Sequence, residues 1–170
     1  LQAIQAGIGT FGSFQEMEED RRRKAALLQL SKEYGDDPNF RLVSISVDPE
    51  GDTPEKMNSW VKENGVDSED WWFLTGDSEE IAKYMISEFK FYATEEVTDP
   101  AMILSVGKFA HDQRLALVDG GANIRGYYDV MNVGRGELEL QRLRMDLKLV
   151  LNPDLKLSDI RDEFAIESPE

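Results

Sequence analysis

The pattern of apolar and polar positions along residues 41–50, RLVSISVDPE, predicts a strand that Asp48 and Pro49 end. The mostly buried positions are predicted to be Leu42, Val43, Ile45 and Val47. A helical pattern follows over residues 52–65, where Thr53 can cap the first turn, Pro54 suits that turn and Gly65 marks the end. These residues therefore predict a strand, a loop and a helix in succession.

The same order repeats in the next segment of the chain. WWFLTG, residues 71–76, predicts a second short strand. Asp77 and Glu80 form a plausible capping box for a helix over residues 77–89. Because strands and helices alternate, the pattern predicts an α/β layer fold.

The second half of the chain predicts a hairpin and a final helix. Residues 90–110 show no clear periodicity and are expected to be irregular. Two alternating apolar runs, RLALVD and NIRGYYD, then flank the turn GGA, which favours a β-hairpin over a dinucleotide-binding loop because no helix follows the glycines. Residues 136–151 repeat apolar side chains at helical spacing, at Leu140, Leu143, Leu147 and Val150.

The two ends of the chain carry weaker patterns. Ile4, Ala6 and Ile8 alternate as in a strand, but the first ten residues are rich in small side chains and leave the element open. We expect one domain over residues 1–151 and a polar, acidic tail over residues 152–170 that docks loosely.

The charge of the chain excludes several classes of partner. Its 34 acidic and 19 basic residues give a net charge of −15, which repels nucleic acid and anionic membrane surfaces. The basic run at residues 21–24 follows acidic residues at i, i+4 spacing, and this predicts a solvated, salt-bridged helix face. No apolar run is long enough to span a membrane, so we expect membrane attachment only through a segment outside this sequence.

The chain has one histidine, His111, and no cysteine. Disulfide and thiolate chemistry are therefore excluded for these residues. No serine or cysteine nucleophile stands at a recognisable spacing from the histidine, so we expect no enzymatic activity.

Several stretches resemble the Sco/SenC family of copper-binding cytochrome c oxidase assembly proteins. The resemblance is carried by VSISVDPEGDTPEKM, WWFLTGD, and His111 followed by LALVDGGANIRGYYD, and it covers about residues 11–150. It implies a thioredoxin-like fold, with a central mixed sheet flanked by helices and a C-terminal β-hairpin and helix. It also implies a respiratory or envelope setting, membrane-associated and facing the periplasm or the mitochondrial intermembrane space, with a protein partner.

The resemblance also shows what this sequence has lost. In the family a C-x-x-x-C-P motif opens the first thioredoxin helix, and its two thiolates bind copper together with a distant histidine. A match without gaps places Phe14 and Glu18 at the two cysteine positions, Glu19 at the proline, and Asp112 at the serine that usually follows the histidine. His111 is then the remnant third ligand, and no bound cofactor is expected.

Two interpretations of His111 stay open. It is either an inherited loop residue, or a weak ligand for copper or another metal with Asp112, Glu18 or Met17. The acidic loop Asp48, Glu50, Asp52, Glu55 lacks the spacing of a calcium loop, and its carboxylates are better explained as ending a strand and starting a helix.

Three aromatic residues are candidates for contact with a partner. Trp71 and Trp72 are adjacent on a strand, so only one of them can point inward. Phe14 stands at the corner that the family uses for chemistry. We therefore expect a degenerate, non-catalytic member that acts as a binding or assembly-associated module. The alternative is a metal carrier that retains His111 with non-thiolate ligands.

Overall fold

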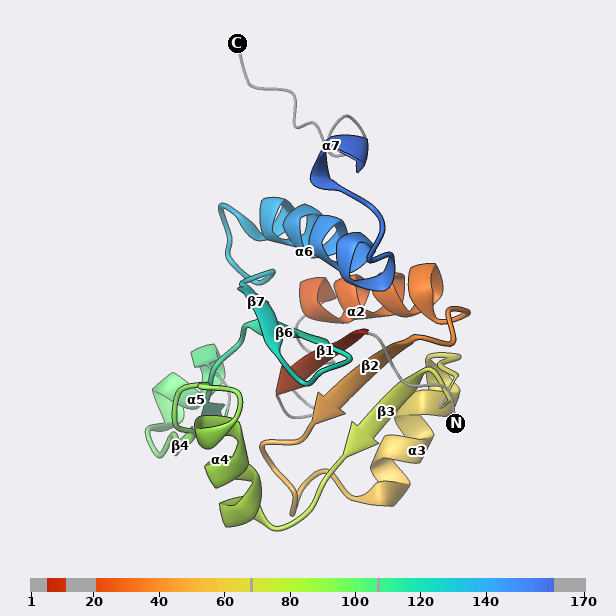
Figure 1. Cartoon of the computed structure of the whole chain (residues 1–170). Coiled ribbons are helices and arrows are strands. Elements are labelled where there is room, and N and C mark those ends of the chain that lie inside the picture. Colours follow the sequence, from red (N-terminus) through yellow and green to blue (C-terminus); the bar gives the residue numbers. More distant parts are fainter. Residues whose placement is uncertain (1–5, 12–20, 68, 107, 161–170) are drawn as a thin grey trace.

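The computed structural model describes residues 6–11, 21–67, 69–106 and 108–160, and of residues 6–11 and 104–106 only the backbone. Its centre is a five-stranded mixed sheet with the strand order β3-β2-β1-β6-β7 (Figure 1). The strands are β1 (Ala6–Phe11), β2 (Phe40–Ile45), β3 (Trp71–Leu74), β6 (Leu115–Asp119) and β7 (Ile124–Tyr128). β1 pairs in parallel with β2 and antiparallel with β6. The sequence did not decide the element at the start of the chain, and residues 6–11 form a strand inside the sheet.

Helices cover both faces of this sheet. α2 (Arg21–Tyr34) and α6 (Gly136–Leu151) lie side by side over one face, and α3 (Pro54–Glu63) joins them beside β3 (Figure 1). They bury one core cluster with the strands, which includes Leu27, Leu30, Leu42, Leu117 and Leu143. The predicted α/β fold, with a central mixed sheet flanked by helices and a C-terminal hairpin and helix, is confirmed.

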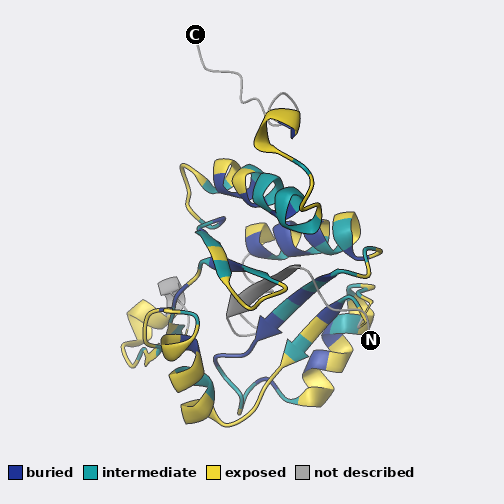
Figure 2. Cartoon of the chain, in the orientation of Figure 1, coloured by how far each residue is buried: buried dark blue, intermediate teal, exposed yellow. Residues whose placement is uncertain are grey.

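The opposite face carries a second, smaller core. α4 (Ser78–Ser87) contributes Met85, which packs with Ile45, Val47, Phe91 and Ala116. Figure 2 shows α4 as largely exposed outside this contact. This face is therefore covered by one short helix and the aromatic residues that follow it.

The predicted helix boundaries agree with the structure to within two residues. The Thr53 hydroxyl accepts a hydrogen bond from the Lys56 amide at the start of α3, and the Asp77 carboxylate accepts one from the Glu80 amide at the start of α4. Gly65 ends the α3 segment with a φ of 63°, a left-handed conformation that glycine adopts at little cost.

Two expectations are corrected. The stretch expected to be irregular holds the two-stranded sheet β4 (Glu95–Glu96) and β5 (Phe109–Ala110), and the helix α5 (Pro100–Val106) between them. Arg23, expected on a solvated helix face, is buried, and its guanidinium donates to the Gln113 carbonyl at 2.9 Å. Its predicted partner Glu19, like Glu18 and Asp20, lies outside the described residues.

The described part of the tail beyond α6 reaches residue 160. α7 (Leu157–Ile160) is a short helix with a buried Ile160, whereas Leu157 is exposed. Within the described ranges, every helix falls short of the length and hydropathy that a membrane crossing requires.

Candidate functional site

The candidate site is the loop between β5 and β6 that holds His111. The Arg23 hydrogen bond to Gln113 ties this loop to the first turn of α2. The helix start, where the family resemblance expects metal ligands, and the histidine loop therefore meet at one corner of the fold. Phe14, Met17 and Glu18 precede that turn and lie outside the described residues.

His111 is half-buried in this loop. Its Nδ1 lies 2.9 Å from the Asp112 carbonyl oxygen, a distance at which a protonated Nδ1 donates a hydrogen bond. Within the described ranges, the structure contains no group of three histidine or carboxylate side chains that could hold a metal ion. A metal site that joins His111 to two carboxylates would therefore need ligands from outside the described residues.

Asp112 is the buried anchor of the loop. Its carboxylate accepts hydrogen bonds from the Tyr92 amide at 3.2 Å and the Arg114 amide at 3.1 Å. The Arg114 guanidinium donates to the same carboxylate twice, at 2.9 and 2.6 Å. The Asp112 carboxylate is therefore occupied by its neighbours rather than turned toward the imidazole.

The same contacts decide the charge state of the pair. Burial alone would raise the pKa of Asp112, but the hydrogen bonds from the Arg114 side chain and from the Arg114 and Tyr92 amides outweigh it and lower this pKa. The hydrogen bond to Asp112 in turn raises the pKa of Arg114. Both side chains are thus charged at neutral pH, and they form a bidentate ion pair.

Aromatic rings surround the Arg114 guanidinium. Its central carbon lies 4.6 Å from the ring centre of Tyr127, 5.1 Å from Tyr92 and 6.0 Å from Phe91. No sequence pattern predicts this cluster, because Tyr92 and Arg114 are far apart in the chain and Tyr92 lies in the stretch without clear periodicity. The nearest sequence signal is Asp112, at the position where the resemblance expects a serine.

The acidic loop after β2 is structural. The Ser46 hydroxyl donates to the buried Asp52 carboxylate at 2.5 Å, and the Asp48 carboxylate accepts from the Gly51 amide at 3.1 Å. Lys108 lies 3.9 Å from Asp48 across the corner. These contacts support the interpretation that the carboxylates end β2 and start α3.

The adjacent tryptophans point to opposite sides, as the strand pattern predicts. Trp71 is fully buried, and its indole N–H donates to the Ser44 hydroxyl at 2.9 Å. Trp72 is 42% exposed, with the Arg41 guanidinium 5.9 Å from its ring centre. Trp71 is therefore unavailable as a partner contact in this fold, which corrects its place among the candidates, whereas Trp72 stays a candidate.

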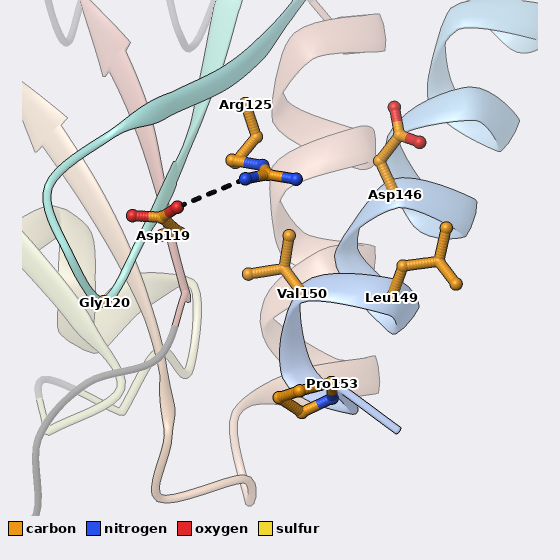
Figure 3. A pocket seen from close by; sticks show the side chains of 7 residues that line it. All are labelled: Asp119, Gly120, Arg125, Asp146, Leu149, Val150 and Pro153. Carbon is orange, nitrogen blue, oxygen red and sulfur yellow. Dashed lines mark ion pairs between the residues drawn. The ribbon is translucent and has the colours of Figure 1, made fainter. Parts of the chain in front are cut away.

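A pocket of about 600 Å³ lies on another part of the molecule, between the β6–β7 turn and the end of α6 (Figure 3). Arg125 forms an ion pair with Asp119 at 3.5 Å on one wall, and Leu149, Val150 and Pro153 line the other. Asp119 also accepts hydrogen bonds from the Gly121 and Asn123 amides and so shapes the hairpin turn. This confirms GGA as a turn.

Comparison with known proteins assigns the family. The SCO1/SenC family model matches residues 22–140. The chain belongs to this family. A SCO1 protein homolog of Bacillus subtilis is 37% identical over 53 residues, which is 31% of this chain and 28% of that relative, so the match spans less than a third of its length.

Solved Sco structures share the fold. BsSco, described as a member of the Sco family of cytochrome c oxidase assembly proteins, superposes with a TM-score of 0.60 at 21% identity, covering 91% of this chain and 83% of its own. Yeast Sco1 with copper bound gives 0.56 at 17% identity, covering 85% and 76%. The thioredoxin-like fold predicted from the resemblance is confirmed, and copper binding is a property of such relatives.

Proposed function

We propose that this Sco-family chain has exchanged copper and thiol chemistry for protein binding, and that it acts as a non-catalytic, assembly-associated module. The main support for this proposal is that the chain has a Sco-type fold but contains His111 and no cysteine. Cu(I) is a soft ion that thiolates hold well and that carboxylates hold poorly. Without thiols the chain also has no group for thiol–disulfide exchange.

The surroundings of His111 support this proposal. The nearest carboxylate in sequence, Asp112, is committed to Arg114 and to two backbone amides, as its hydrogen bonds show. To ligate a metal, Asp112 would have to leave this ion pair, and breaking a buried ion pair costs free energy. These hydrogen bonds hold the loop in place, a property that suits a binding surface.

The setting of this module follows from its family. The family resemblance supports a protein partner in the assembly of cytochrome c oxidase. It also supports a location facing the periplasm or the mitochondrial intermembrane space. The net charge of −15 disfavours nucleic acid and an anionic bilayer as partners.

A copper titration tests the proposal. Competition with a chelator of known affinity, for Cu(I) and Cu(II) separately, should show the same weak binding in the wild-type chain and in His111→Ala. The competing function is a metal carrier that retains His111 with oxygen or thioether ligands. Stoichiometric binding tighter than about micromolar that disappears in His111→Ala would establish that carrier and overturn the proposal.

A further inference from the structure

A continuous row of aromatic side chains runs from α4 to the His111 loop. The ring of Tyr84 lies 5.8 Å from Phe89, and Phe89 lies 5.7 Å from Phe91. The row ends at Arg114, whose guanidinium contacts both Phe91 and Tyr92. We call these four residues, Tyr84, Phe89, Phe91 and Tyr92, the aromatic row.

The two ends of the aromatic row are exposed, and its middle is packed. Tyr92 is 70% exposed and Tyr84 is 53% exposed, whereas Phe91 is buried in the second core. The Tyr84 ring lies edge-on against the half-buried Phe89, and the Tyr92 ring lies against the Arg114 guanidinium. The Tyr92 backbone is also held, because its amide donates to the buried Asp112 carboxylate. Exposed aromatic rings that are already ordered lose little entropy on binding, and such residues are typical anchors of protein interfaces.

The segment that carries the aromatic row is acidic on balance. Eight acidic residues, three lysines and one arginine lie within residues 77–114, a net charge of −4. Glu95 and Glu96 on β4 pair with Ala110 and Phe109, which lead directly into His111. Both glutamates are exposed. The apolar ends of the row thus lie in a segment with a negative field.

We propose that the aromatic row is a docking surface for a positively charged protein surface that carries apolar side chains. The proposal rests on the proposed function as a binding module, and it names the surface and the chemistry of the partner. A second copy of this chain does not fit, because two chains of charge −15 repel each other. A basic partner gains both steering by the negative field and burial of Tyr84 and Tyr92.

The probe is a short helical peptide of lysine and leucine, with a counterpart in which glutamate replaces every lysine. NMR of the ¹⁵N-labelled chain locates the binding, and fluorescence anisotropy measures its affinity. The lysine peptide should shift amide signals within residues 84–114, and the glutamate peptide should shift none. Tyr92→Ser should weaken binding about tenfold or more, and Tyr84→Ser should change it in the same direction.

Matched controls distinguish binding at the aromatic row from nonspecific attraction of the basic peptide to the acidic chain. Leu157→Ser and Val133→Ser remove exposed apolar side chains on other elements and should leave the affinity unchanged. Thermal unfolding of each variant should match the wild type. Shifts centred on another face, or an unchanged affinity in both tyrosine variants, would overturn the docking surface but leave the absence of tight copper binding intact. Tight copper binding would overturn the proposed function but leave the peptide map as measured.

Discussion

Replacement of Trp71 by alanine should lower the free energy of unfolding by about 3–5 kcal/mol, the usual cost of truncating a buried aromatic side chain. Trp71 is fully buried against Trp60, whose ring centre lies 5.5 Å away, and it stacks on Phe73 at 5.0 Å. The substitution also leaves the buried Ser44 hydroxyl without its indole donor. Chemical denaturation followed by circular dichroism measures the change.

Trp72→Ala is the matched control for that experiment. It removes the same side chain from the next position, where the ring is 42% exposed, so the cost should stay below about 1 kcal/mol. Similar losses in the two variants would contradict the arrangement of β3. A normal stability combined with weaker binding of a partner in Trp72→Ala would keep this residue among the interface candidates.

Asp112→Ala should lower the free energy of unfolding by about 2–3 kcal/mol. It removes the acceptor of two backbone amides and leaves Arg114 without its ionic partner. Because Arg114 is partly exposed, water compensates for part of the loss, and the expected value lies below that of a fully buried pair.

The effect of Asp112→Ala should depend on pH. The hydrogen bonds lower the pKa of Asp112 in the folded chain, so its contribution to stability is complete above the unfolded value, about 3.9, and is lost as the pH falls through the folded value. The difference between the wild type and the variant should therefore be constant near neutrality and shrink below about pH 4. Glu79→Ala, which breaks an exposed pair with Lys83, should cost less than about 0.5 kcal/mol throughout. A pH-independent loss in Asp112→Ala would contradict the ion pair.

The elements with a clear period could be predicted from the sequence. Both faces of β2 and β6 are covered: Leu42 and Leu117 pack in the first core, and Ile45 and Ala116 pack in the second. α6 repeats leucines toward α2. Cap residues fixed the starts of α3 and α4, since Thr53 and Asp77 accept hydrogen bonds there. At these positions the cap residues and the apolar periodicity predict the same helix boundaries.

The elements of residues 90–110 were missed for a physical reason. β4 and β5 are two residues each and α5 is seven, too short for a period to appear. The solvated-face prediction failed at Arg23 because charge spacing along a helix does not report which residues another loop will cover. The Asp112–Arg114 ion pair was missed because its contribution to stability depends on burial. Part of that burial comes from Tyr92 and Tyr127, which are distant in sequence and contact Arg114 only in the folded chain.

The central claim is that the copper site of the family was lost from this chain by replacement of its thiolate ligands. Its most direct test restores them in Phe14→Cys/Glu18→Cys and measures Cu(I) affinity by chelator competition, in that variant, in the same variant with His111→Ala, and in the wild type. The claim predicts one tightly bound Cu(I) in the double variant, weaker binding when His111 is removed, and no tight binding in the wild type. Tight, His111-dependent binding already present in the wild type would contradict it.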